Sequence, residues 1–207
     1  MKRALIVQGG WEGHCPAEVA DILTAQLRAH AFDVIRADTL DAFKDPELGT
    51  LDLIVPVWSL GGEPADQMEP LLAAVEGGVG LAAQHGSIDL FRDWRYHFMI
   101  GGQFVCHPGG DGVRYTVHID GAPSPITKGM ADFEVGSEQY YLHVDPGNTV
   151  LATTRFDDVV MPVTWVRRYG KGRVFYCSLA HTPAQIRAPA VLDMLTRGML
   201  WVARRDV

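Results

Sequence analysis

The feature that most restricts the fold of this chain is a set of short runs made almost entirely of apolar residues. These runs span residues 4–7, 51–58 and 79–83, and each is followed by polar residues and glycines. Strands that are apolar at nearly every position, rather than at alternate positions, are typical of a parallel sheet covered on both faces. The chain is therefore expected to contain a buried parallel sheet.

Helical patterns separate these runs. Pro16 opens a stretch in which apolar side chains recur at helical spacing, and residues 68–75 and 188–203 repeat that spacing. A further short strand is expected at Phe32–Ala37. Strands that alternate with helices in this way predict an α/β fold with a doubly wound, mostly parallel sheet and helices on both faces.

The middle third of the chain has a different pattern. Short β-like segments at 114–119, 133–141 and 150–154 alternate there with turns rich in glycine and proline. With 207 residues, the chain is long enough for one sizeable core. We therefore expect a single domain over residues 1–207, with a β-rich insertion or antiparallel extension in its middle third.

Composition and charge exclude several classes of partner. The net charge is −7 and the basic residues form no extended cluster, so a nucleic-acid partner is not expected. The three cysteines are far apart and form no CxxC pair, which favours reduced thiols and a cytoplasmic location. The first apolar run is too short for a signal peptide or a membrane span. The expected partner is a neutral or polar small molecule, with no membrane contact.

Three histidines follow predicted strands. His14 comes after the first strand, His85 after the run at 79–83, and His181 after a β-like segment at 173–177. Ligands of open parallel sheets bind outside the carboxyl ends of the strands, so these imidazoles are expected to share one pocket. The same edge is expected to receive four further candidates for substrate binding: Gly10, Trp11, Trp58 and Gln84.

The turn around His85 resembles the nucleophile elbow of α/β hydrolases, in which a strand turns sharply into a helix. The central position holds no serine or cysteine, and Ser87 has the wrong flanking residues for that motif. Acyl-enzyme chemistry is therefore disfavoured. Three roles remain open for His85: a general base, a ligand of a sugar hydroxyl and a metal ligand.

Two further clusters lie in the middle third. Gly102, in a glycine pair that permits close backbone approach, precedes His107 after a short strand. Glu138 stands beside Tyr140 in a β-like segment, where a carboxylate and an aromatic ring together suit a polar sugar ring. The alternative, that Tyr140 is a sheet residue and Glu138 a solvated one, remains open.

Taken in order, the motifs resemble the ThuA-like, or trehalose-utilisation, branch of the class I glutamine amidotransferase-like superfamily. The resemblance implies a flavodoxin-like fold without the usual cysteine nucleophile, a role in disaccharide use and sugar oxidoreductases as neighbours in the pathway. Where the family usually has glycine before its last histidine, this chain has Ala180. The stretches that carry the resemblance are 9–14, 84–86, 99–104, 107–108, 124–129, 138–141, 162–165, 169–176 and 178–181.

These observations predict an enzyme that acts on a trehalose-type disaccharide or its 3-keto derivative by hydrolysis, elimination or isomerisation through general acid/base steps. Its expected catalytic residues are His14, His85, His107, Glu138 and His181. Its expected binding residues are Gly10, Trp11, Trp58, Gln84, Gly102 and Tyr140.

Two alternatives remain open. One is a non-catalytic module that binds a sugar or regulates a partner enzyme, because the nucleophile is missing. The other is a metal-dependent hydrolase: the histidines and Glu138 suit zinc or another divalent ion, although no H-x-x-x-H or H-E-x-x-H spacing supports it and no cofactor is required by the sequence. The apolar C-terminal helix and the β-like middle third are candidate surfaces for a homo-oligomer.

Overall fold

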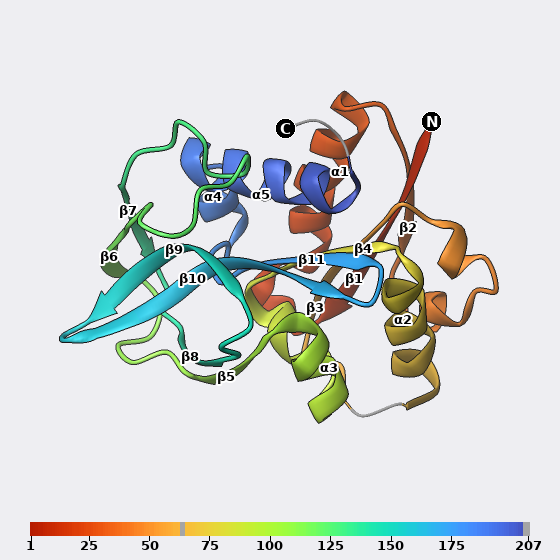
Figure 1. Cartoon of the computed structure of the whole chain (residues 1–207), viewed down its shortest axis with the longest axis horizontal. Helices are drawn as coiled ribbons and strands as arrows, with labels where there is room; N and C mark the ends of the chain where they lie inside the picture. The colour runs from red at the N-terminus through yellow and green to blue at the C-terminus, as the bar shows by residue number, and fades with distance from the viewer. Residues whose placement is uncertain (63–64, 205–207) are drawn as a thin grey trace.

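A computed structural model describes residues 1–62 and 65–204, and a seven-stranded mixed sheet runs through its centre (Figure 1). The strand order is β2-β1-β3-β4-β11-β10-β9. The first five of these strands are parallel, whereas β10 pairs antiparallel with both β11 and β9. The strands of this sheet are β1 (Lys2–Gly10), β2 (Phe32–Ala37), β3 (Leu53–Ser59), β4 (Gly80–Gln84), β9 (Thr149–Phe156), β10 (Val159–Tyr169) and β11 (Gly172–Cys177).

Each central strand contributes side chains to two cores. In β1, Ala4 and Ile6 belong to one hydrophobic cluster, and the alternating Leu5 and Val7 belong to the other. Successive side chains of a strand point to opposite faces, so a strand buried on both faces must be apolar at every position. This is the physical origin of the apolar runs in the sequence.

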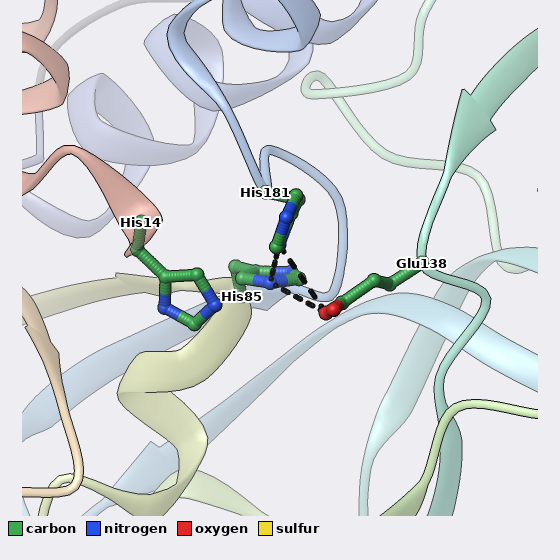
Figure 2. Close-up of side chains that lie close together, drawn as sticks. All are labelled: His14, His85, Glu138 and His181. Atoms are coloured by element: carbon green, nitrogen blue, oxygen red, sulfur yellow. Dashed lines mark hydrogen bonds and ion pairs between the residues drawn. The ribbon is translucent and has the colours of Figure 1, made fainter. Parts of the chain in front are cut away.

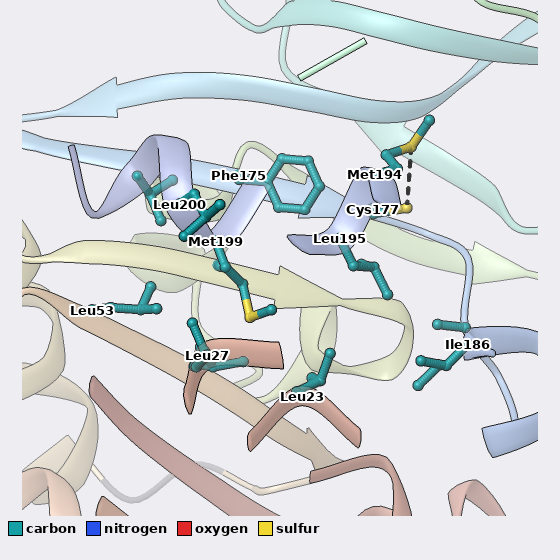
Figure 3. Close-up of a cluster of buried hydrophobic side chains, with 14 of the residues drawn as sticks. Leu23, Leu27, Leu53, Phe175, Cys177, Ile186, Met194, Leu195, Met199 and Leu200 are labelled. Carbon is teal, nitrogen blue, oxygen red and sulfur yellow. Dashed lines mark hydrogen bonds between the residues drawn. The ribbon is translucent and has the colours of Figure 1, made fainter. Parts of the chain in front are cut away.

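Helices cover both faces of the sheet (Figure 1). The first cluster, which includes Leu23, Phe175 and Leu195, fills one face (Figure 3); the second covers the other face. In the part of the chain that the structure describes, no helix combines the length and apolarity needed to cross a membrane. The prediction of an α/β fold with a mostly parallel, doubly wound sheet is confirmed. The helices of the first face are α1 (Pro16–Ala29), α4 (Pro183–Ile186) and α5 (Pro189–Val202), and those of the second are α2 (Ala65–Gly77) and α3 (Trp94–Ile100).

The middle third is rich in β structure, as predicted, but one predicted strand was wrong in extent. The segment 133–141 is divided into β7 (Phe133–Ser137) and β8 (Tyr141–Val144). Between them, residues 138–140 belong to no strand, although Glu138, Gln139 and Tyr140 are all buried. β7 pairs with β6 (Val113–Val117) and β8 pairs with β5 (Gly102–Cys106), forming two small sheets beside the main one.

Candidate functional site

A pocket with a volume of about 350 Å³ opens beyond the carboxyl ends of β1, β3 and β4. This volume lies within the range of small-molecule sites, roughly 300–1,000 Å³. Segments that follow strands of the main sheet supply one side of the pocket, and the middle third supplies the other through Phe104 of β5, His107, Glu138 and Tyr140. It is lined by Trp11, His14, Ser59, Leu60, Gly86, Ile88, Asp89, Phe104, His107, Glu138 and Tyr140.

Four chemically active side chains converge at the floor of this pocket, and we call them the centre: His14 and Glu138 line the pocket, and His85 and His181 are buried beside them (Figure 2). Each offers one nitrogen or oxygen atom, and these four atoms lie within 4.8 Å of one another. The histidines follow β1, β4 and β11 in the chain. The structure thus brings the three imidazoles together at the sheet edge where the strand-end rule places them.

The turn that carries His85 is held by hydrogen bonds to its backbone. His85 has a φ of 47°, a left-handed conformation that is unfavourable for a residue with a side chain. The Tyr176 hydroxyl donates to the His85 carbonyl at 2.9 Å, and the Tyr96 hydroxyl donates to the Ser87 carbonyl at 2.6 Å. The Ser87 hydroxyl is itself buried and donates to the carbonyl of Pro56. Ser87 is therefore a support of the turn and does not face the pocket.

The hydrogen bonds of His85 define which of its nitrogens carries the proton. Nδ1 lies 3.0 Å from the carbonyl oxygen of Ser178, and because a carbonyl only accepts, Nδ1 must be the donor. In the neutral ring Nε2 then has a free lone pair. It faces the Tyr140 hydroxyl at 2.9 Å, Nδ1 of His181 at 3.0 Å and Oε2 of Glu138 at 3.2 Å. One lone pair thus meets three polar partners.

Glu138 reaches the centre because its backbone is fixed on both sides. The Tyr115 hydroxyl donates to the Glu138 carbonyl, and the Gln139 amide donates to Oγ1 of Thr154. Burial raises the pKa of Glu138, but the hydrogen bond with His85 and the neighbouring imidazoles outweigh it, so its pKa lies below the usual value. The carboxylate is therefore ionised at neutral pH.

His14 is held as a neutral imidazole. Burial, followed by repulsion from His85 and His181, lowers the pKa of His14 to about 3. Its Nδ1 is hydrogen bonded to the Ser59 hydroxyl, so the other ring nitrogen is turned toward the rest of the centre (Figure 2). The pKa of His181 is also lowered, mainly by burial and then by His85. At neutral pH these imidazoles offer lone pairs instead of positive charge.

Two predicted residues lie on the wall of the pocket beside the centre. Tyr140 stacks on His85 with ring centroids 4.4 Å apart. His107 lies farther out, with Nε2 3.7 Å from Oε1 of Glu138, and its buried Nδ1 has no hydrogen-bond partner among the described residues. Trp11 forms the rim: it is 51% exposed and contacts the ring of His14 edge-on.

The remaining predicted residues do not line the main pocket. A side chain at Gly10 would meet the backbone oxygen of Ser59 at 2.1 Å, so this glycine permits the close approach of β1 and β3. Trp58 covers Gly9, and together with the buried Gln84 it borders a narrow crevice behind His14. Gly102 packs under His143 and Trp165. These residues shape the pocket from behind.

Sequence reasoning did not select six of the residues that line the pocket: Ser59, Leu60, Gly86, Ile88, Asp89 and Phe104. Side chains alternate along a strand, so the choice between Trp58 and Ser59 at the end of β3 depended on the register of the strand, which the sequence did not define. Phe104 stands in a motif that the resemblance contains. No pattern in the sequence singled out Asp89.

Comparisons with known proteins agree with the observed fold. The family model ThuA, described as trehalose utilisation, matches residues 3–202. Putative ThuA-like proteins from Parabacteroides merdae and Bacteroides uniformis have similar structures, with TM-scores of 0.79 and 0.80 at 17% and 18% identity. The alignments cover 98% and 99% of this chain and 90% and 92% of theirs.

A β-galactosidase from Rahnella sp. R3 also contains this fold. It has a TM-score of 0.66 at 18% identity, and the match covers 95% of this chain and 30% of the galactosidase. No curated protein sequence matches the chain. Because the family model spans nearly the whole sequence, the chain belongs to the ThuA family, the family of trehalose utilisation, and this supports a role in carbohydrate use.

Proposed function

We propose that the protein acts on a trehalose-type disaccharide, or on its 3-keto derivative, by general acid/base chemistry. The observation that carries the proposal is the convergence of three imidazoles and one carboxylate at the floor of a pocket with aromatic walls. Sugars present both matching surfaces: hydroxyl groups around the ring edge and C–H patches on the ring faces. The family description agrees with such a substrate.

The walls and the floor of the pocket have different tasks in this proposal. Trp11 at the rim and Phe104 in the wall offer aromatic faces on which a pyranose ring stacks. The centre at the floor offers hydrogen-bond acceptors to the hydroxyl groups that point inward. Contacts to both the faces and the edge of the sugar ring fix its orientation, and this places one C–H bond next to one base.

Neutral imidazole is a suitable base for a keto-sugar. A ketone at carbon 3 makes the C–H bond at carbon 2 acidic, and a histidine removes that proton. The electron pair left on carbon 2 then expels the glycosidic oxygen from carbon 1, and that oxygen takes a proton from an acid in the pocket. Addition of water to the eliminated product completes a hydrolysis, whereas return of the proton to the opposite face of carbon 2 is an isomerisation. A sugar oxidoreductase acting earlier would supply the ketone.

A second candidate function is supported by the turn at His85. Hydrolases with this type of turn place a nucleophilic serine or cysteine there, and this chain places an imidazole whose Nδ1 is committed to the Ser178 carbonyl. A protein without the nucleophile can retain the pocket as a sugar-binding or regulatory module.

The experiment that separates the two functions is incubation of the purified protein with 3-keto-trehalose, followed by chromatography of the products. We expect conversion by the wild type. His85→Ala and His181→Ala should each lower turnover by about 10²–10⁴-fold, because each removes a group from the proton-transfer centre. Their melting temperatures should stay within about 5 °C of the wild type.

The matched control is His118→Ala. His118 also pairs with a carboxylate, that of Asp132, but it lies outside the pocket. Turnover by this variant should equal that of the wild type. Binding of the keto-sugar by the wild type without conversion supports the module instead, and unchanged kinetics in both pocket variants eliminates the centre as the catalytic group.

A further inference from the structure

Three atoms of the centre that can bind a metal ion lie at the corners of a small triangle. Nε2 of His85, Nδ1 of His181 and Oε2 of Glu138 are separated by 3.0, 3.2 and 3.3 Å. In the neutral ring Nε2 of His85 is an acceptor, because Nδ1 donates to Ser178. In that state its lone pair lies 3.2 Å from a carboxylate oxygen in a buried site, where a cation bound by both atoms is a favourable partner.

We propose that His85, His181 and Glu138 bind a divalent first-row transition-metal ion, with His14 beside it as a fourth candidate ligand. The inference concerns the same pocket as the proposed function, but it does not rest on the substrate, because binding of an ion can be measured without a sugar.

The dimensions of the triangle support this assignment. Zinc ligands lie about 2.0–2.1 Å from the ion, and in a tetrahedral site this places neighbouring ligand atoms about 3.3 Å apart. The three observed separations are within about 0.3 Å of that value.

The chemistry of the ligand set indicates the class of ion. Two or three imidazoles with one carboxylate favour zinc and its neighbours in the first transition row, whereas magnesium and calcium prefer sites made of oxygen. Two histidines and one glutamate are also the protein ligands of known catalytic zinc sites, which keep one position open for water or substrate.

The outer hydrogen bonds of the centre match this use. Histidines that bind metals commonly donate a hydrogen bond from the other ring nitrogen to a carbonyl or a similar group. His85 does so to Ser178, and His14 is hydrogen bonded through Nδ1 to Ser59. These contacts fix the two rings with Nε2 facing the centre. In Figure 2, His14 and Glu138 approach His85 and His181 from opposite sides.

An ion at this position changes how the pocket would serve a keto-sugar. It would supply a positive charge beside a carbonyl or hydroxyl oxygen of the ring. The lone pairs of His85 and His181 would then be committed, and His107, whose Nδ1 is unpaired among the described residues, would remain for proton transfer.

The test uses protein without a histidine tag, treated with a chelator, dialysed and titrated with Zn²⁺ alone in a calorimeter. We expect about one ion per chain with a Kd below about 10 µM, and a rise in melting temperature with Zn²⁺ concentration. Replacement of Zn²⁺ by Co²⁺ gives an independent readout, because a Co²⁺ ion of low coordination number with imidazole ligands absorbs visible light.

His85→Ala, His181→Ala and Glu138→Gln should each weaken Zn²⁺ binding by at least about 100-fold. Glu138→Gln keeps the shape of the side chain, so it remains informative if an alanine variant fails to fold. The control His118→Ala should bind Zn²⁺ like the wild type, since its ring lies outside the centre.

The inference is overturned if the wild type binds no Zn²⁺ below about 100 µM, or if the three centre variants bind it as tightly as the wild type. The proposed function fails separately. Turnover of 3-keto-trehalose without ion binding leaves that function in place and removes the metal site, whereas ion binding without turnover does the reverse.

Discussion

Histidine meets carboxylate in two regions of this molecule, with opposite consequences. On the surface, Nδ1 of His118 contacts Oδ2 of Asp132 at 2.8 Å, while the backbone N–H of Ile119 donates to the other oxygen at 2.8 Å. Each oxygen of Asp132 thus has its own donor. In the centre, the same two kinds of side chain place two ring nitrogens and one carboxylate oxygen within 3.3 Å of one another. The surface pair has a separate donor for each oxygen, whereas the atoms of the centre share one another as partners.

The two regions also differ in how far their side chains are exposed to water. The side chains of His118 and Asp132 are 32% and 54% exposed, but those of His85 and Glu138 are only 2% and 9% exposed. Water screens the surface pair, which is therefore expected to contribute little to stability. Charges in the centre are screened far less, so a proton, an ion or a polarised substrate there interacts strongly. The surface pair serves as a reference for what the centre does beyond structure.

Among substitutions outside the four residues of the centre, the largest effect is expected from Gly86→Ala. A methyl group at Gly86 would lie 2.6 Å from the Ser59 hydroxyl and 3.0 Å from Cε1 of His14, so the imidazole must shift. Loss of alignment in an active site costs about 100-fold in rate, and we expect a loss of that size in turnover of 3-keto-trehalose. The measurement is the steady-state rate of product formation.

The matched control is Gly136→Ala in β7. An added methyl group there meets nothing within 4 Å, so turnover should be unchanged. If Gly86→Ala is as active as Gly136→Ala, the position of His14 does not matter to the reaction, and the difference between the centre and the surface pair is one of burial alone.

A smaller effect is expected from Tyr140→Phe. The substitution removes the hydroxyl that lies 2.9 Å from Nε2 of His85 but keeps the ring that stacks on the imidazole. Loss of one buried hydrogen bond amounts to about 1.4 kcal/mol, or about 10-fold in kcat/KM.

Tyr141→Phe is the control for this change, because Tyr141 follows in the chain but does not line the pocket. It should leave kcat/KM unaltered. Equal losses in the two variants would mean that the Tyr140 hydroxyl acts on the fold of the segment and not on His85.

The sequence predicted the sheet and its edge well, because both depend on local patterns. Apolar runs follow from burial on both faces, and the strand-end rule needs only the order of elements to bring His14, His85 and His181 together. Ala180, before His181, has a φ of 82°, in the left-handed region that favours glycine, so its loop has a conformation that the glycine implied by the resemblance would suit.

The position of Glu138 depends on contacts that no local pattern contains. Its segment leaves the β structure, and it is held by Tyr115 of β6, which donates to the Glu138 carbonyl, and by Thr154 of β9, which accepts from the Gln139 side chain. The sequence therefore identified the carboxylate as a candidate but predicted a continuous strand through it. Gln84 shows the converse: it ends a strand at the expected edge, yet its side chain is buried beneath the centre.

The smallest effect is expected from Asp132→Asn in the surface pair, and it concerns stability alone. The N–H of Ile119 and then His118 lower the pKa of Asp132 below its ordinary value of 3.8, so the charged carboxylate stabilises the folded chain. That contribution is present above the ordinary pKa and is lost as the pH falls through the lower, folded value. The melting temperature of the variant should thus lie slightly below that of the wild type at pH 6, and the gap should close as the pH falls below about 4. Turnover of 3-keto-trehalose should not change, since neither member of the pair lines the pocket. A gap that widens in acid would mean that Asp132 is destabilised by its surroundings, and the surface pair would then no longer serve as the reference for the centre.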